Sequence, residues 1–474
     1  MTKADLQTGT ASRQPIIPQQ LSLWDTASLI VGIVVGTAIF RSPTMVFQNS
    51  PHTWAALGVW FLGGALCLCG ALCYAELATT FPRNGGDYEY LRLAYGNWLA
   101  FLFGWAQLVA VLTGSIGAMA YAFADYGSQF WNLAPTGTAL IAAATIAALT
   151  VANALGVAIG KSLQNVFTCA KIGGLALVVL AGLGWGSQPV FSTESNSAVH
   201  GPGFGLALVF VLYAYGGWND AVYVAAEVRD QRRNLPRALL YGITSIALLY
   251  IAVNLAYLRG LGFEGACQTA TPAADVVQQV VRPWGAKAIS LLVMISALGA
   301  INGLVLAGSR IYAVVGEDYP LLAWLGRWSP RSGAPVASIL LQGGISIVLV
   351  FLVGTQRGRN SIDQTLARLG MSSIPWDEYF GGFEVLVAGT APVFWTFFLL
   401  NGFSLFVLRR SQPDRHRPFS VPWYPLPPAI FCLTCAYMLY CSIEYARSLV
   451  LVGALPVAFG IPLYLLSRRL KMHH

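Results

Sequence analysis

The chain has 474 residues, of which 56% are hydrophobic and only 10% are charged, and its formal net charge is +8 at pH 7. A water-soluble protein of this length carries far more charge on its surface, so the composition excludes an ordinary soluble domain. The histidines fall in loops or tails, and no HExxH, Gly-x-Ser-x-Gly or P-loop pattern stands in a suitable context. An enzyme, an ATP-driven pump, a bound cofactor and a metal centre are therefore not expected.

Long apolar segments follow one another along almost the whole chain. A transmembrane helix needs about 20 mostly apolar residues, and twelve segments meet this requirement. We therefore predict an all-α polytopic membrane protein with twelve transmembrane helices. The polar residues 1–20 lack an apolar core and a cleavage site, so they are interpreted as a cytoplasmic tail and not as a signal peptide. The predicted spans are 25–47, 53–75, 97–123, 138–158, 163–184, 204–227, 237–260, 287–309, 336–354, 384–408, 422–442 and 448–467.

The positive charges are distributed unevenly between the loops. If the amino terminus is inside, 19 of the 28 Lys and Arg residues lie on the inner side and eight on the outer side. This bias follows the positive-inside rule and predicts that both termini are cytoplasmic. The net charge thus reflects topology. A nucleic-acid partner is not expected, because no basic stripe alternates with aromatic residues on a soluble face.

Ten of the twelve spans divide into two sets of five. Residues 21–184 would form the first repeat and residues 203–409 the second, with residues 422–467 as two accessory helices. The first span of each set contains a small-residue cluster, GIVVGTAIF in one and AYGGWND in the other. Paired, glycine-interrupted segments at corresponding positions indicate an inverted-repeat transporter with its site near the membrane midplane.

The two clusters offer complementary groups to a small zwitterion. Unwinding at Gly36-Thr37-Ala38 would free amides at the start of a half-helix, which favour a carboxylate. Unwinding at Gly216-Gly217 would free carbonyls at the end of another half-helix, including those of Tyr213 and Ala214, which favour an ammonium group. The alternative is that the glycines only allow close helix packing.

Four polar residues inside predicted spans are candidates for a functional role. Lys171 lies about 10 Å from the inner end of its span at 1.5 Å per residue, so it is interpreted as functional, with snorkelling to the inner surface as the alternative. A lysine among the carbonyls of the first span could replace a bound cation. Asp220 either faces the pocket and favours cationic substrates or supports the unwound segment. Asn302 either faces the pocket or pins two helices, and Glu227 pairs with an arginine of the next loop.

Two connecting segments carry further predictions. The outer segment 355–383 is the longest connection, and its Ile362, Leu366 and Leu369 recur at near-helical spacing, which predicts a short helix on the outer surface. It could serve as a lid or be a variable loop. In the basic segment before the seventh span, Pro236 predicts the first turn of that helix.

These motifs are similar to those of the amino acid–polyamine–organocation superfamily, and within it of the L-type amino acid transporter-like permeases. The resemblance extends over residues 20–470. It implies a LeuT-type fold with a 5+5 inverted repeat, discontinuous helices 1 and 6, and alternating access to one amino-acid site. The motifs that carry it are LWDTASLIVGIVVGTAIF, AELATTFPRNGGDYEYLRLAYG, NVFTCAK, YAYGGWNDAVYVAAEVRDQRRNLPRAL, ALGAINGLVLAGSRIYAVV and HRPFSVPWYPLPP.

The resemblance also implies roles for individual residues. Thr37 and the amides of Gly36 and Ala38 would hold the substrate carboxylate, and Tyr213 would be the aromatic gate. Lys171 would stand where sodium-coupled relatives bind a cation, which implies sodium-independent exchange or proton coupling. The amino group would be held by the carbonyls of Val34, Tyr213, Ala214 and Gly216, with Asn219 and Asn302 lining the region around it.

Two departures from the family pattern stand out. The first motif usually reads Gly-Ser/Thr-Gly, and its third position here is Ala38, whose methyl group predicts a preference for smaller substrates. The vertebrate heteromeric members join a glycoprotein through a cysteine after span 3, and the loop YGSQFWNLAPTG contains none. We therefore expect a transporter of neutral L-amino acids that has no disulfide-linked heavy chain. A cationic amino acid or polyamine permease and a non-transporting sensor are the alternatives.

Overall fold

The computed structural model describes residues 19–131, 135–191, 203–282, 284–376 and 381–472. Within these ranges the regular elements are helices, apart from one isolated bridge between Leu21 and Val228. Of the predicted cytoplasmic tail, residues 1–18 lie outside the described residues. The prediction of an all-α protein is therefore confirmed for the part of the chain that the structure describes.

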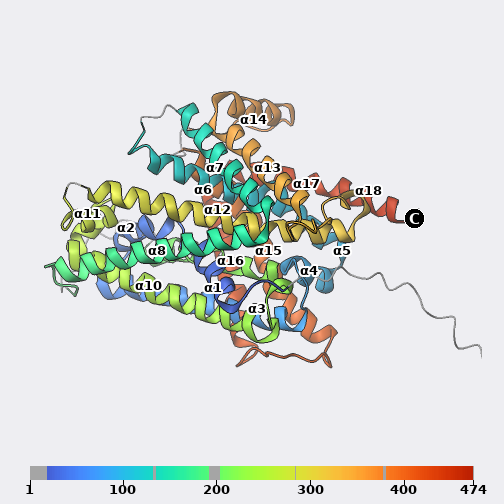
Figure 1. The fold of residues 1–474 in the computed structure, drawn as a ribbon, viewed down its shortest axis with the longest axis horizontal. Coiled ribbons are helices and arrows are strands. Elements are labelled where there is room, and N and C mark those ends of the chain that lie inside the picture. Colours follow the sequence, from blue (N-terminus) through green and yellow to red (C-terminus); the bar gives the residue numbers. More distant parts are fainter. Residues whose placement is uncertain (1–18, 132–134, 192–202, 283, 377–380, 473–474) are drawn as a thin grey trace, which may run out of the picture.

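Ten helices in the described ranges are long and apolar enough to cross a membrane, and each corresponds to a predicted span. Figure 1 shows α8, α10 and α12 running side by side along the long axis of the molecule, and α8 packs against both α10 and α12. The spanning helices are α3 (Thr53–Thr80), α5 (Asn97–Ala106) with α6 (Leu112–Gly127), α7 (Pro135–Leu155), α8 (Val157–Trp185), α10 (Gln231–Gln268), α12 (Gly285–Asp318), α13 (Val336–Gly354), α15 (Gly381–Ser411), α16 (Leu426–Ala446), and α17 (Val450–Ala458) with α18 (Gly460–Met472).

The two remaining predicted spans are the two that the sequence predicts to be interrupted. The first is divided into α1 (Leu23–Val34), a short 3-10 helix η1 (Ala38–Phe40) and α2 (Ser42–Gln48). The second is divided into α9 (Phe204–Ala214) and the 3-10 helix η3 (Trp218–Glu227). Both interruptions are thus confirmed. Gly217 has a φ of +99°, which only glycine adopts readily, and a Cβ there would lie 2.7 Å from Ile33.

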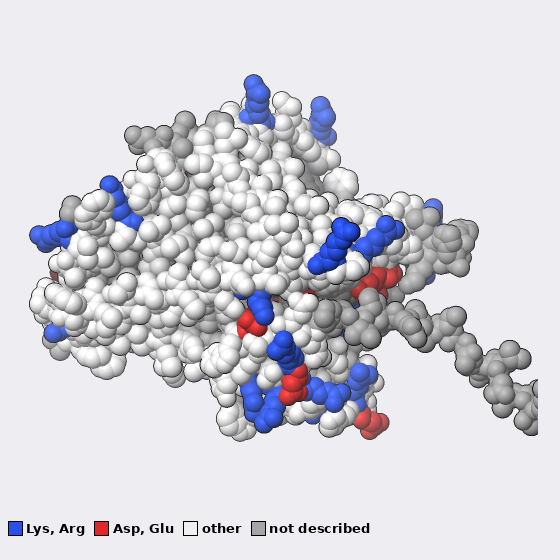
Figure 2. Space-filling view, viewed as in Figure 1, with Lys and Arg blue, Asp and Glu red and all other residues white. Residues whose placement is uncertain are grey.

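The molecule has two distinct ends. The short helix α4 (Asp87–Tyr95) and the carboxyl-terminal helix α18 lie at one end, whereas α2 and α11 (Pro272–Gln278) lie at the other (Figure 1). We call these the α4 end and the α11 end. Figure 2 shows a broad uncharged area across the middle of the visible face, with Lys and Arg side chains gathered toward its edges. This is the charge distribution of a multi-pass membrane protein.

Backbone and side-chain contacts close the α4 end around helix α1. The amide of Leu21 donates to the carbonyl of Glu227 at 2.9 Å, and the amide of Arg229 donates to the carbonyl of Leu21 at 2.8 Å. One turn later, Asp25 accepts a hydrogen bond from Asn165 at 2.9 Å and pairs with Lys161 at 3.3 Å. We call these contacts the α1 latch.

A buried ion pair lies beside the latch. The Arg310 guanidinium donates to both carboxylate oxygens of Glu227, at 2.8 and 3.1 Å, and to the carbonyl of Leu306 at 2.7 Å. Both charged side chains are at most 2% exposed. The prediction that Glu227 pairs with an arginine of the next loop was wrong about the partner: Arg310 belongs to α12, which packs against η3.

Of the two predictions for connecting segments, the one for Pro236 was wrong and the one for the outer helix is confirmed. Helix α10 begins at Gln231, so Pro236 lies inside the helix and not in its first turn. Between residues 355 and 383 the predicted short helix is present as α14 (Gln356–Arg368), which packs on α13 and is capped by the Thr355 hydroxyl. Residues 377–380 of this segment lie outside the described residues.

Candidate functional site

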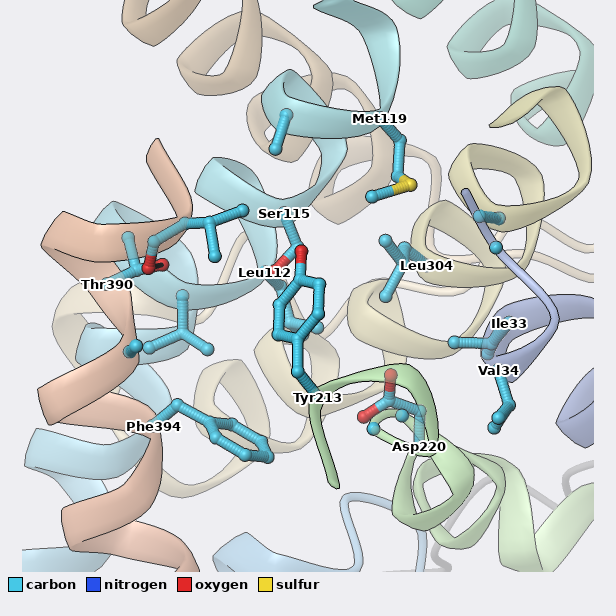
Figure 3. Close-up of a pocket in the computed structure, with 18 of the residues that line it drawn as sticks. Ile33, Val34, Leu112, Ser115, Met119, Tyr213, Asp220, Leu304, Thr390 and Phe394 are labelled. Atoms are coloured by element: carbon cyan, nitrogen blue, oxygen red, sulfur yellow. Dashed lines mark hydrogen bonds between the residues drawn. The ribbon is translucent and has the colours of Figure 1, made fainter. Parts of the chain in front are cut away.

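A cavity of about 170 Å³ lies between the two interrupted helices. It is smaller than the roughly 300–1,000 Å³ of sites for drug-sized ligands, so it fits a small molecule. Residues of α6, α12 and α15 complete its wall (Figure 3). Most of the lining is apolar, and the polar side chains that reach it are Thr37, Gln107, Ser115, Tyr213, Asp220, Tyr223 and Thr390.

The first interruption presents free backbone donors to the cavity. The amide of Gly36 donates to the carbonyl of Val34 at 2.7 Å, so it is already occupied. In the described part of the chain, the amides of Thr37 and Ala38 have no hydrogen-bond partner, and both residues line the cavity. An unpaired amide in a nonaqueous site costs several kcal/mol unless a ligand or water meets it. This turn therefore favours a small anionic group such as a carboxylate.

Lys171 of α8 fixes the same turn from behind. Its ammonium donates to the carbonyls of Gly32 at 2.7 Å and Val35 at 3.0 Å, and also to the carbonyl of Ser296 at 3.2 Å. The side chain is 0% exposed and does not line the cavity. An ammonium group has three protons to donate, and Lys171 has three backbone carbonyls as acceptors. Lys171 thus holds helix α1 against α12 through these three hydrogen bonds.

A tyrosine joins the two interruptions to each other. The Tyr250 hydroxyl of α10 lies near the carbonyls of Val34, at 3.2 Å, and Ala214, at 3.0 Å. These carbonyls end α1 and α9, so the two broken helices meet at one hydroxyl. On the α12 side, the Ser296 hydroxyl lies 2.7 Å from the Val35 carbonyl. No sequence pattern indicated Tyr250, because nothing distinguishes it from other tyrosines in apolar spans.

Tyr213 projects from the end of α9 into the cavity, with its hydroxyl near Ser115 in the view of Figure 3. Its side chain remains 37% exposed, although the cavity wall surrounds it. Met119 and Leu304 lie across the cavity from it, and Phe394 lies beside it (Figure 3). A ring that stands in the cavity can move without disturbing the core, which suits a gate over a bound molecule.

The structure brings most of the predicted site residues together around the cavity. Of the predicted set, those that line the cavity are Val34, Gly36, Thr37, Ala38, Tyr213, Gly216 and Asp220. The other members are Ala214, Asn219, Asn302 and Lys171, and they lie outside the lining. Ala214 still contributes through its carbonyl, which meets Tyr250.

The two asparagines point to other partners. Asn302 exchanges hydrogen bonds with Asn153 at 2.8 Å and Gln164 at 2.9 Å, which connects α12 with α7 and α8. This arrangement agrees with the second interpretation of Asn302, in which its side chain pins helices together. Asn219 points away from the cavity, and its amide donates to the Tyr223 hydroxyl at 3.2 Å. The sequence could not distinguish these directions, because it does not define how each helix is rotated.

Some lining residues were not predicted. Gln107 begins a π-helical turn (Gln107–Val111) between α5 and α6, and such turns often occur at functional sites. Its side-chain oxygen is buried without a partner among the described residues. A glutamine inside an apolar run was the available signal. Thr390 and Phe394 come from α15 and carried no such signal, since both are common in membrane helices.

A model of the amino acid permease family matches residues 21–464. The chain belongs to this family. Over 86% of its length, this permease is 30% identical to the b(0,+)-type amino acid transporter 1 of Homo sapiens, of which 79% is covered. It is 28% identical over 87% of its length to the serine/threonine exchanger SteT of Bacillus subtilis, of which 89% is covered. The Asc-type amino acid transporter 1 of Mus musculus is 27% identical over 96% of the permease and 82% of that protein.

Family membership agrees with the chemistry of the cavity. The permease is a multi-pass membrane transporter and not an enzyme, and it is similar to the L-type branch that the sequence motifs indicated. Asp220 is the one charged residue among those that line the described cavity. A charge at this depth is expensive unless a ligand, a proton or a partner compensates it. How Asp220 is compensated therefore bears on what the transporter carries.

Proposed function

We propose that this permease carries amino acids across the cytoplasmic membrane by alternating access to the central cavity, with neutral L-amino acids as its substrates. The observation that carries the proposal is the pairing of free amides at Thr37 and Ala38 with carbonyls of the second interruption across one small cavity. This pairing matches the carboxylate and the ammonium group of a zwitterion. The Thr37 hydroxyl adds a donor to the carboxylate, and the carbonyls of Tyr213 and Gly216 accept from the ammonium group.

The architecture that we propose for this cycle is a LeuT-type inverted repeat. Residues 21–184 and 203–409 form its two halves, and residues 422–467 add two accessory helices. The repeat is supported by the matching positions of the two broken helices, each the first of its set. Both termini and the α4 end face the cytoplasm, which is supported by the excess of Lys and Arg in the loops assigned to that side.

Transport is proposed to be independent of sodium, by exchange or by proton symport. The supporting observation is the Lys171 side chain, whose Nζ donates to carbonyls of α1 and α12. A cation bound at the same carbonyls would have to displace it. The loop after α6 has no cysteine in YGSQFWNLAPTG, so we propose that the permease works without a disulfide-linked partner.

A permease for cationic amino acids or polyamines is the second candidate, and Asp220 is the observation that favours it. Its carboxylate lies at the edge of the cavity below Tyr213 (Figure 3). A substrate with a positive side chain would compensate this charge directly. A membrane sensor that binds an amino acid without moving it ranks below both, because the cavity lies between two broken helices of the kind that transport requires.

Purified permease in liposomes tests these proposals. Liposomes loaded with one unlabelled amino acid should take up labelled neutral amino acids, and empty liposomes should take them up only with acid outside or not at all. Replacing sodium by choline should leave uptake unchanged. Competition with excess lysine or arginine separates the neutral from the cationic candidate. Binding without flux under every condition would leave the sensor as the remaining function.

Replacing Ala38 by glycine is expected to widen substrate choice. Removal of the methyl group gives substrates more room beside the Thr37 and Ala38 amides. Because one methyl or methylene group in a pocket is worth about 1–3 kcal/mol, we expect the ratio of leucine uptake to alanine uptake to rise by about tenfold or more. Competition uptake in liposomes measures this ratio. Ala144→Gly on the exposed face of α7 is the control, and an equal ratio in both variants would contradict the role of Ala38.

A further inference from the structure

A second buried carboxyl lies behind the cavity, and no positive side chain meets it in the described residues. Asp87 begins α4, directly after the turn at Gly85 and Gly86, and is 2% exposed. Its Oδ2 accepts hydrogen bonds from the Tyr223 hydroxyl at 3.1 Å and from Asn219 at 3.5 Å. Its Oδ1 has no hydrogen-bond partner within the described chain. Asp87 does not line the cavity, so a substrate cannot neutralise it.

Tyr223 connects this carboxyl to the cavity. Its hydroxyl reaches Asp87. Asp220 stands three residues before Tyr223 in the 3-10 helix η3, where side chains at i and i+3 lie above one another. Asp220 and Tyr223 both line the cavity, and Asp220 is 4% exposed. The order from the cavity toward the α4 end is therefore Asp220, Tyr223 and Asp87. These groups form one chain of two carboxyls with a hydroxyl between them.

Among the described residues, the groups that surround this chain are hydroxyls and not positive charges. Tyr74 of α3 and Tyr90 of α4 face Asp87, and Tyr312 of α12 faces Asp220. Two carboxylates that close together in a buried site cannot both remain ionised without a cation, so at least one of them holds a proton. Burial raises the pKa of Asp87 to about 7, against the hydrogen bonds from Tyr223 and Asn219, which favour the carboxylate. Asp87 can thus both take up and release a proton near neutral pH.

We propose that Asp220, Tyr223 and Asp87 form the proton site that couples net amino-acid uptake to the proton gradient, an inference that rests on the proposed transport function. A proton from the cavity binds the Asp220 carboxylate. Protonated Asp220 donates its proton to the Tyr223 oxygen while the Tyr223 hydroxyl donates its own proton to Asp87. Asp220 becomes a carboxylate again, Tyr223 remains neutral, and Asp87 becomes the neutral acid.

The α1 latch gives this relay its direction. Asp87 follows the turn whose Gly85 amide donates to the Tyr223 carbonyl at 3.0 Å, and Asn84 of the same turn accepts from the amide of Ala226 at 2.8 Å. Both contacts join the α4 segment to η3, the helix whose end is held by the latch. When the α4 end opens, these contacts separate and water reaches Asp87, which then releases its proton on that side.

The variants Asp87→Asn and Tyr223→Phe test the relay. Asparagine has the shape of the protonated acid and no charge, so Asp87→Asn should fold and bind substrate but carry no proton. Phenylalanine keeps the ring of Tyr223 and breaks the chain at its middle member. The matched control is Asp414→Asn, because Asp414 is exposed in the loop before α16.

Two measurements on the same liposomes separate the relay from transport itself. The first is exchange of labelled for unlabelled neutral amino acid at equal pH on both sides. The second is net uptake with acid outside, during which a pH dye trapped in the liposomes reports the internal pH. Wild-type permease and Asp414→Asn should show both activities, with internal acidification during net uptake. Asp87→Asn and Tyr223→Phe should retain exchange and lose net uptake to the level of protein-free liposomes.

Four results would each overturn either the relay or the proposed function. Exchange in the wild type without any effect of the pH gradient would overturn the relay and leave the transporter standing. Normal proton-driven uptake by Asp87→Asn would also overturn the relay. Asp220→Asn could lose arginine or lysine uptake while uptake of neutral substrates still acidifies the liposomes. Asp220 would then bind the positive charge of a substrate, and its place in the relay would be overturned. Absence of exchange in the wild type would instead overturn the proposed function.

Discussion

Lys171→Ala is expected to lose nearly all transport, whereas Lys161→Ala keeps nearly all of it. Hydrogen bonds to a charged group are worth about 1.5–3 kcal/mol each, and Lys171 makes three of them to backbone carbonyls of α1 and α12. Without the ammonium these carbonyls lose their donor in a site that excludes water. The turn that carries the free amides of Thr37 and Ala38 would then no longer be fixed.

Lys161 is the matched control, since it lies on the same helix α8 and also contacts α1. It pairs with Asp25 at 3.3 Å, but its side chain is 30% exposed, and a pair of this kind contributes about 0–1 kcal/mol. Exchange in liposomes measures both variants, and Lys171→Met separates the loss of charge from the loss of volume. Equal activity of Lys171→Ala and Lys161→Ala would show that Lys171 has no part in transport beyond packing.

Removing one partner of the Arg310–Glu227 pair is expected to cause the largest loss of stability. Breaking a buried pair leaves an uncompensated charge and costs about 3–5 kcal/mol. Arg310→Met should therefore lower the thermal midpoint of the purified protein markedly. The double variant Arg310→Met with Glu227→Gln should recover much of this loss, because it leaves neither charge behind.

Thermal unfolding in detergent, followed by fluorescence, measures this cycle. Arg410→Met is the control, because Arg410 is exposed near the end of α15 and a substitution there should stay within about 0.5 kcal/mol of the wild type. If the losses of the two single variants simply add in the double variant, the two side chains are not energetically coupled. The two hydrogen bonds from Arg310 to Glu227 would then contribute no coupling energy.

The features that the sequence predicted correctly are those with a strong local signature. Twenty-residue apolar runs indicate spans whatever their neighbours are, and ten of them appear in the described chain as continuous helices. The two glycine clusters indicated the interruptions because they stand at the same position, the first span, in each set of five spans. Lys171 was identified because a charge inside an apolar run requires a partner, and it has three.

The features that were missed depend on the rotation and contacts of helices. Asn219 and Asn302 are polar residues beside the cavity, yet their side chains bind Tyr223 and Asn153 on faces turned away from it. A sequence does not define these faces when the helix is apolar all round. Tyr250 joins the two interruptions through one hydroxyl, and no pattern distinguishes it from other tyrosines. Helix α10 starts before Pro236 because its first residues pack at the α4 end, which the local signal does not contain.

The α1 latch also has a thermodynamic consequence. Its two backbone hydrogen bonds and the partly exposed Asn165–Asp25 bond contribute about 0.5–1.5 kcal/mol each, and the partly exposed Lys161–Asp25 pair adds at most about 1 kcal/mol. A difference of a few kcal/mol corresponds to a minor state populated at roughly 0.1–10%. The permease with its α4 end open is thus an excited state within thermal reach, and a substrate needs only a small preference for that state to change the resting distribution.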